Sequence, residues 1–146
     1  MTRIAKVHVV VFSLAFALVA CATPASQQIN SGAEPVSVNP DFRVDNQKAE
    51  TGEDLFGSRG CAGCHSVGRG RLAGPDLFAV RERRSIEWLT AFLKDTNKML
   101  ETDPIAQALL KEFHGNRMPN IRMTDQEIEA LIHYLQRTTN QRRAGR

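Results

Sequence analysis

From Lys48 onward, apolar residues recur every three or four positions, and no segment shows the alternation of a β-strand. The last of these helical segments is the clearest, because Thr124-Asp125-Gln126-Glu127 has the form of a capping box. The apolar residues that follow at helical spacing are Ile128, Leu131, Ile132 and Leu135. We predict a helix that begins here and fades into a charged tail after Arg137.

Three earlier segments are also predicted to be helical. One runs through about Ala49 to Ser58; a second has Ser85 as its N-cap; a third opens at Asp103-Pro104 and ends at Gly115. Their apolar residues are Leu55, Phe56, Ile86, Trp88, Leu89, Phe92, Leu93, Ile105, Ala108, Leu109 and Phe113. The predicted fold is all-α, with four or five short helices in a domain at 48–138 and a charged tail at 139–146.

The N-terminal residues have the pattern of an export signal. Arg3 and Lys6 precede a stretch from Val7 to Ala20 that is almost wholly apolar. This stretch is shorter than the roughly 20 residues of a transmembrane helix. We therefore predict a signal peptide at 1–20 and a location on the periplasmic side of the envelope of a Gram-negative bacterium.

The end of this signal resembles a bacterial lipobox, Leu18-Val19-Ala20-Cys21, in which Cys21 becomes the acylated first residue of the mature chain. A lipid on Cys21 would account for the odd number of cysteines, three in all. Ala22 then favours the outer membrane. Ordinary cleavage after Ala22 is the alternative.

Residues 21–47 are rich in small and polar residues and show no sustained period, which is typical of a flexible linker. A linker of this length has a reach of about 25–30 Å. A lipid-anchored domain on such a linker could move between partners at the membrane.

Composition adds two constraints. With one Trp, one Tyr and seven Phe, the core is short of large side chains, and a buried cofactor would relieve this shortage. The formal charge of +3 falls to about +1 once the signal is removed, because 17 basic residues then face 16 acidic ones. No basic run of the nucleic-acid-binding kind is present, so we exclude that class of partner.

The chemistry is indicated by Cys61-Ala62-Gly63-Cys64-His65. Two thiols three residues apart can add to the two vinyl groups on one edge of a porphyrin, and the adjacent His is then placed under the iron; this motif is typical of covalent haem attachment. A thioredoxin-like site would need a βαβ context, which is absent. Zinc would need a fourth ligand. A short structural disulfide is the plain alternative in an exported protein.

Residues 49–138 resemble a class I, mitochondrial-type c-type cytochrome in its bacterial single-haem form. The motifs that carry the resemblance are CAGCH, Gly74-Pro75-Asp76-Leu77, Met118-Pro119 and the closing amphipathic helix. It implies one covalent haem c held by Cys61 and Cys64. It also implies that Gly52-x-x-x-Phe56 crosses Leu131-x-x-Tyr134 in the fold.

The resemblance further assigns His65 and Met118 as the axial ligands, with the Pro75 carbonyl accepting a hydrogen bond from the His65 ring. Met123 is the main rival to Met118, although its place before the Thr124 cap suits a packing role on Ile128. Three further candidates are Met99, His114 and His133, of which we expect His133 to be exposed. Trp88 is a candidate donor to a haem propionate, with a core role as its alternative.

These features favour a one-electron carrier rather than an enzyme, because two axial ligands leave no open iron site and no catalytic constellation is present. The resemblance implies redox partners such as a bc1-type complex, a terminal oxidase or a periplasmic oxidoreductase, met by a monomer in weak complexes. The alternatives are a dedicated subunit or accessory factor of a larger redox enzyme and, less favoured, a haem gas sensor.

Overall fold

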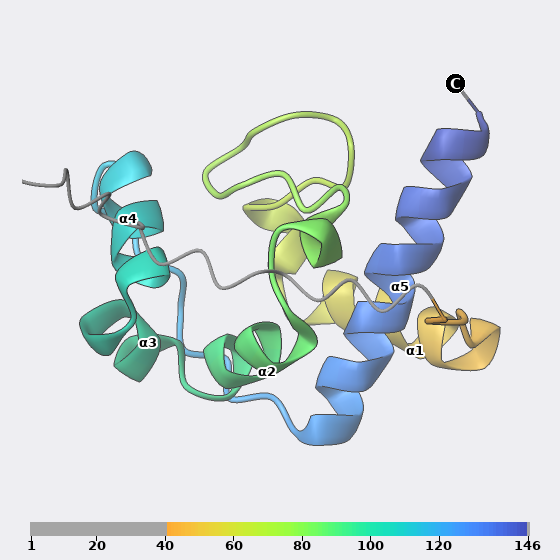
Figure 1. Ribbon diagram of the computed structural model, residues 1–146, viewed down its shortest axis with the longest axis horizontal. Helices are drawn as coiled ribbons and strands as arrows, with labels where there is room; N and C mark the ends of the chain where they lie inside the picture. Colours follow the sequence, from red (N-terminus) through yellow and green to blue (C-terminus); the bar gives the residue numbers. More distant parts are fainter. Residues whose placement is uncertain (1–40, 146) are drawn as a thin grey trace, which may run out of the picture.

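The computed structural model describes residues 41–145, and all regular secondary structure within this range is helical. Five α-helices and two 3-10 turns follow in the order α1 (Asn46–Ser58), η1 (Cys61–Gly63), η2 (Val80–Glu82), α2 (Ile86–Lys94), α3 (Thr96–Thr102), α4 (Pro104–Glu112) and α5 (Asp125–Ala144) (Figure 1). The predicted all-α fold class is confirmed. The signal peptide, Cys21 and the linker up to residue 40 lie outside the described residues.

The helix starts follow from side-chain caps. Ser85 accepts a hydrogen bond from the amide of Trp88, and Asp103 accepts one from that of Ala106. Thr124 and Glu127 form the reciprocal capping box that the sequence predicts. Each cap satisfies an amide that has no partner within its own helix, so short segments can begin at defined residues.

Three helices differ from the sequence prediction. Helix α1 begins at Asn46, capped by Asp45, so ordered structure starts before the predicted end of the linker at residue 47. Helix α3 was not predicted, and Asp95 caps it. Helix α5 continues to Ala144 instead of fading after Arg137.

The extension of α5 has a tertiary cause. Thr139 is 2% exposed, and its hydroxyl accepts a hydrogen bond of 3.1 Å from the amide of Ala79. Arg143 forms an ion pair of 2.6 Å with Glu82. The turn η2 therefore holds the last turns of α5 in place, and basic side chains near a helix C-terminus are favoured by its dipole. The expected charged tail is thus helical through residue 144.

Helices α1 and α5 cross at Gly52, and this crossing organises the domain (Figure 1). A Cβ atom at Gly52 would lie 2.1 Å from the carbonyl oxygen of Ala130, so only glycine allows this approach. One turn further along, the rings of Phe56 and Tyr134 pack at 5.3 Å between centroids. This is the crossing that the sequence resemblance implied.

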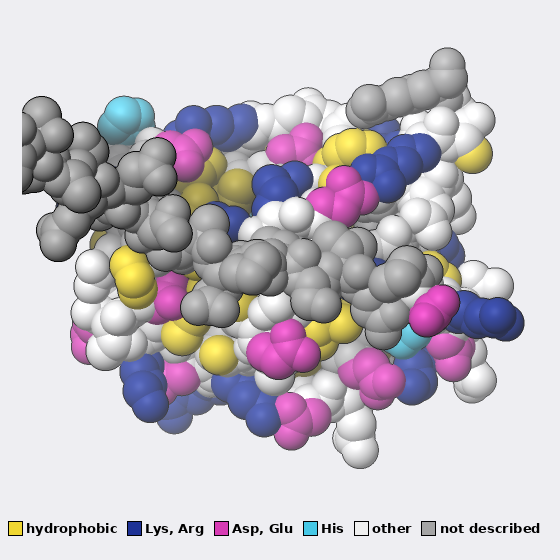
Figure 2. Space-filling view, in the orientation of Figure 1, with side chains coloured by type: hydrophobic (Ala, Val, Ile, Leu, Met, Phe, Trp, Pro, Cys, Tyr) yellow, Lys and Arg dark blue, Asp and Glu magenta, His cyan; other side chains and the backbone are white. Residues whose placement is uncertain are grey.

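The buried apolar residues come from both ends of the domain. The cluster consists of Phe56, Cys61, Val67, Val80, Leu89, Met123, Ile128, Leu131, Ile132 and Leu135. Charged side chains cover the surface with both signs interspersed, as Figure 2 shows for one face. Among the described residues, no helix is both long enough and apolar enough to span a membrane.

His133 is buried, which corrects the expectation that it is exposed. His133 is 7% exposed, and the ring of Phe42 packs on its ring with 4.7 Å between the centroids. The amide of Asp45 donates a hydrogen bond of 3.0 Å to His133 Nδ1, so this nitrogen must be unprotonated. The contact comes from residues far away in the sequence, and the helical pattern of α5 could not indicate it.

We expect the stability of the domain to fall as pH falls below about 6.5. Burial, with smaller contributions from the charge of Lys48 and others, holds the pKa of His133 below its ordinary value of 6.5. The unfolded chain therefore binds a proton before the folded chain does, and the free energy of unfolding decreases with each step toward acid. Urea unfolding at pH values between about 5 and 8 measures this slope.

His133→Gln should flatten the slope in this window. His114→Asn is the matched control, because His114 is exposed and its φ of 55° is one that Asn tolerates. The control should keep the wild-type slope. An unchanged slope in His133→Gln would show that another group is responsible.

Candidate functional site

The first wall of the site is the turn that follows α1. Gly60 adopts a left-handed conformation with φ of 77°, after which η1 begins. The amide of His65 donates to the carbonyl of Cys61 at 2.9 Å, so the two cysteines and the histidine are held in one compact turn. Cys61 is buried and Cys64 is exposed, and both thiols are free. Burial raises the pKa of the Cys61 thiol.

The orientation of the His65 ring is fixed by two neighbours. Its Nδ1 lies 2.9 Å from the carbonyl oxygen of Pro75, and because a carbonyl can only accept, Nδ1 is the donor. In the neutral ring this leaves Nε2 with a free lone pair. Gly74 packs flat on the ring, where a Cβ atom would lie 2.5 Å from His65 Cε1. The ring is thus ready to act as a metal ligand through Nε2.

The loop after the motif is held together by Asp76. Its carboxylate accepts hydrogen bonds from the amides of Gly68 (2.7 Å), Gly70 (2.6 Å) and Phe78 (2.8 Å). Burial by itself would raise the pKa of Asp76, but the hydrogen bonds together outweigh it and hold the pKa below its ordinary value. The sequence indicated an irregular loop here; the carboxylate gives it one conformation.

Arg71 joins this loop to the segment after α4. Its Nη1 donates to Glu112 Oε1 at 3.1 Å, its Nη2 donates to the Glu112 carbonyl at 2.7 Å, and its guanidinium lies 3.8 Å above the Phe113 ring. The Asn116 side chain adds a hydrogen bond of 3.0 Å to the carbonyl of Ala73. These contacts hold the residues before Met118 against the loop that follows His65.

We expect Arg71→Gln to loosen this connection. An exposed ion pair and an exposed cation–π contact together contribute about 1 kcal/mol, so amide hydrogen exchange in residues 113–118 should accelerate about fivefold. The matched control is Arg117→Gln, since Arg117 lines the same cavity and forms a 3.9 Å ion pair with Glu101, but no hydrogen bond or ion pair joins it to the loop after His65 within residues 41–145. Equal exchange rates in the wild type and Arg71→Gln would contradict this role.

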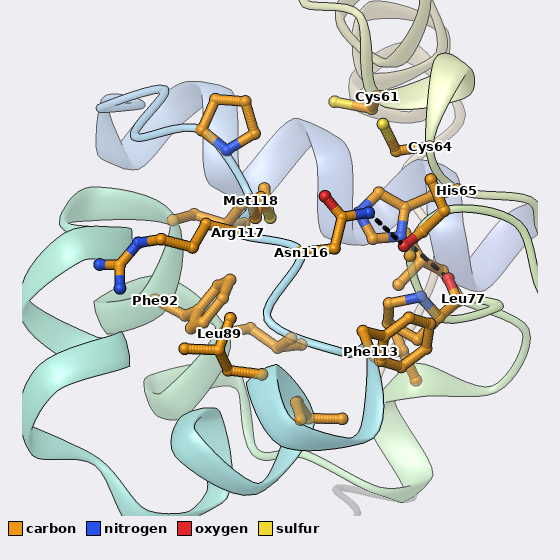
Figure 3. Close-up of a pocket in the computed structure, with 18 of the residues that line it drawn as sticks. Cys61, Cys64, His65, Leu77, Leu89, Phe92, Phe113, Asn116, Arg117 and Met118 are labelled. Carbon is orange, nitrogen blue, oxygen red and sulfur yellow. Dashed lines mark hydrogen bonds between the residues drawn. The ribbon is translucent and has the colours of Figure 1, made fainter.

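An apolar cavity lies between these walls, and its empty volume is about 1100 Å³, including the space at its mouth. Its lining includes Cys61, Cys64, His65, Pro75, Leu77, Trp88, Leu89, Phe92, Leu100, Leu109, Phe113, Asn116 and Met118. Figure 3 shows the two thiols and His65 coming from one segment, with Met118 on the separate loop that follows α4.

Of the five candidate axial partners, only Met118 lines this cavity. Met123 is 4% exposed and belongs to the core cluster with Ile128, which is the packing role that its position before the cap suggests. His133 bonds to the Asp45 amide instead. The structure therefore brings His65 and Met118 to the same cavity and places the others elsewhere.

Trp88 lines the cavity, but its indole N–H is already engaged. It donates a hydrogen bond of 3.1 Å to Asp103 Oδ1, and the same oxygen accepts from the amide of Ala106. A propionate would have to compete with this carboxylate for the indole. Beside the indole ring lies the guanidinium of Arg84, whose Nε is buried without a partner. Arg84 is not among the residues that line the cavity.

Most of one wall of the cavity comes from residues that were not predicted to belong to the site. Helices α3 and α4 contribute residues that include Leu100, Leu109 and Leu110, and Asn116 follows them. An apolar stripe on a short helix predicts burial but cannot show whether it faces a core or a cavity. The available signal for α3 was Asp95, a residue type that often caps helices, whose side chain accepts a hydrogen bond from the Lys98 amide.

The donor set fits a haem joined through two thioethers. Two thiols, an imidazole with a free Nε2 and one uncharged thioether surround a cavity that is otherwise lined mainly by apolar side chains. Within residues 41–145, no group of three or more His, Cys, Asp or Glu is placed to hold a metal ion, which disfavours the zinc alternative.

The comparisons with known proteins agree with this geometry. A family model described as Cytochrome c matches residues 49–139. The structure is similar to a cytochrome c from Rhodothermus marinus, with a TM-score of 0.64 and 24% identity, covering 74% of this chain and 99% of that one.

It is also similar to the cytochrome c domain of a Pseudomonas putida protein, pp3183, with a TM-score of 0.56 and 38% identity; 64% of this chain and 92% of that one are covered. An engineered form of the Rhodothermus marinus protein matches at a TM-score of 0.62 and 24% identity, covering 74% of this chain and 96% of that chain. No curated protein matches the chain.

Proposed function

Since this chain belongs to the cytochrome c family, whose members bind covalent haem c and transfer electrons, we propose that it is a single-haem, one-electron carrier with His65 and Met118 as axial ligands. The observation that carries the proposal is the shared cavity of these two residues, in which His65 presents a free Nε2 lone pair. The haem supplies the one-electron Fe(III)/Fe(II) change when it is bound.

Each residue of the site has a separate task. Cys61 and Cys64 anchor the cofactor through thioether bonds, which makes its loss from the protein very slow. The Pro75 carbonyl, as acceptor of the Nδ1–H bond, keeps the His65 ring in one tautomer and one orientation. The Met118 thioether is uncharged and soft, so it favours the reduced state relative to a second histidine.

The cavity walls suit electron transfer rather than catalysis. Apolar side chains from α2, α3 and α4 line the cavity and would exclude water from a bound haem, which would raise the cost of the more highly charged oxidised state. With His65 and Met118 both as ligands, the iron would have no open position for a substrate.

The remaining assignments extend this proposal to the cell. We propose export through the signal at 1–20, a lipid anchor on Cys21 with the outer membrane favoured, and a monomer that exchanges electrons with a bc1-type complex, a terminal oxidase or a periplasmic oxidoreductase. The support is the pattern of the N-terminal sequence and the family's covalent haem, which is attached outside the cytoplasm.

The test is expression of the full chain in a bacterium with a complete haem-attachment system. The purified protein should carry the mass of one haem, and the Cys61→Ser, Cys64→Ser double variant should carry none. The ferrous protein should then give up one electron per haem to an artificial acceptor and should not bind carbon monoxide. Carbon monoxide binding to the native ferrous form would favour the gas sensor, and absence of the haem mass would end the proposal.

A further inference from the structure

A second cavity lies behind the His65 ring. His65 and Phe56 line both this cavity and the haem-sized one. Its other walls are α1, the loop at 66–72 and the C-terminal half of α5. We call it the arginine groove after the three arginines that line it, Arg69, Arg137 and Arg142.

The groove carries an excess of positive charge. Arg137 forms a 2.6 Å ion pair with Glu53, the only acidic residue on the walls of the groove. Arg69 and Arg142 form no ion pair within residues 41–145. Six other arginines and lysines among the described residues do have an acidic partner. Arg69 and Arg142 are therefore two guanidinium groups without an acidic partner on the walls of one concave site.

Two buried donors in the groove have no partner. The Nε atoms of Arg137 and Arg142 are both buried and without a hydrogen bond. Buried N–H groups are nearly always bonded in folded proteins, and a bound anion or water would give these two an acceptor. Both arginines lie on α5, and the groove also contains the polar side chains of Thr138 and Gln141.

Arg142 is held in place by the loop opposite. Gly68, at φ of 83°, has no side chain, and a Cβ atom there would lie 2.6 Å from Arg142 Cδ. The Arg142 stem thus packs on the Gly68 backbone, and the Asp76 carboxylate fixes that backbone by its bond to the Gly68 amide. The position of Arg142 in the groove therefore depends on the conformation of this loop.

We propose that the arginine groove binds a phosphate group. Two unpaired guanidinium groups balance the double negative charge that a phosphate monoester carries near neutral pH. The planar guanidinium offers parallel N–H donors that match the oxygens of a tetrahedral oxyanion. The ligand is free inorganic phosphate or a phosphate monoester, which present the same group to the groove.

The experiment uses the ferric holoprotein and isothermal titration calorimetry, with chloride added to keep ionic strength constant. Inorganic phosphate should bind saturably at one site, and Arg142→Gln should weaken this binding at least tenfold. Arg143→Gln is the matched control, because it removes the same charge from the next position of α5, where Arg143 bonds to Glu82 outside the groove. The control should change the affinity less than twofold.

Glycerol phosphate in a parallel titration distinguishes the two sources. Equal or tighter binding of the ester identifies a monoester as the ligand, and binding of inorganic phosphate alone identifies the free anion. The proposal is overturned if neither ligand saturates, or if Arg142→Gln and Arg143→Gln weaken binding equally, since that result reflects net charge alone.

A second readout rests on the proposed function and separates its failure from that of this inference. Because His65 lines the groove, a bound anion should lower the midpoint potential of the wild type, and the shift should be absent in Arg142→Gln. Saturable phosphate binding without a redox-active haem would contradict the proposed function and leave the phosphate site standing. A redox-active holoprotein that binds no phosphate would contradict the phosphate site and leave the proposed function standing.

Discussion

Replacement of Met118 by alanine is expected to lower the midpoint potential of the holoprotein by on the order of a few tenths of a volt, since axial ligands set haem potentials over a range of roughly 0.8 V. The thioether is the only soft neutral ligand on its wall of the cavity. Its loss removes the preference for the reduced iron and opens an axial position to water. The weak red absorption of methionine-ligated ferric haem should disappear at the same time.

Met123→Leu is the control for this experiment. Met123 is 4% exposed in the core cluster, so a change of similar volume should cost less than about 1.5 kcal/mol and leave both spectrum and potential unchanged. Spectroelectrochemical titration of the two variants gives the answer. A Met118→Ala protein that keeps the methionine spectrum would show that we have assigned the wrong ligand, and a Met123→Leu protein that loses it would name the right one.

Replacement of Gly52 by alanine is expected to destabilise the domain by about 3 kcal/mol or more, at the upper end of overpacking changes. The new Cβ atom would lie 2.1 Å from Ala130 O, 2.6 Å from Ala130 C and 2.8 Å from Tyr134 Cβ. Two of these atoms are backbone and cannot rotate away, so α1 and α5 must separate. Urea unfolding of the holoprotein measures the loss.

Gly57→Ala is a control on the same helix. It lies within α1, and a Cβ atom there meets nothing within 4 Å. Alanine should therefore raise the free energy of unfolding by roughly 0.5–1 kcal/mol, because it lowers the entropy of the unfolded chain and favours the helix. If Gly52→Ala were as harmless as Gly57→Ala, the close crossing would not contribute to stability.

The caps and the cofactor motif show why part of this structure could be predicted. Ser85, Asp103 and Thr124 each accept a hydrogen bond from the amide three residues ahead, so the whole interaction is contained in a short stretch of sequence. The same holds for Cys61, Cys64 and His65, which one turn brings together. Interactions between residues so close in sequence do not depend on how the rest of the chain packs.

The errors involve contacts between distant residues. His133 was expected to be exposed, yet Asp45 and Phe42 cover it from the other end of the domain. The bond from the Trp88 indole to Asp103 could not be predicted either, while its contact with a propionate stays a prediction. A helical period states which residues share a face, but it does not state what that face contacts.

The choice between Met118 and Met123 depends on both the local sequence and the tertiary contacts. Both residues precede a proline or a cap, and the spacing alone left them as rivals. The structure separates them because Met118, on the loop after α4, lines the cavity, whereas Met123 packs in the core cluster with residues of α5. Arg71 and Asn116, which join that wall to the loop after His65, belong to the site only through these contacts.

The amino-acid sequence by itself thus determined the helical class, the helix starts and the haem-attachment motif, since each depends on residues within one or two turns of each other. The tertiary structure alone decided which methionine lines the same cavity as His65, where α5 ends, and how three arginines come to share a groove behind the His65 ring. The physical reason is that side-chain partners from separate elements are chosen by packing, which brings together residues up to 88 positions apart.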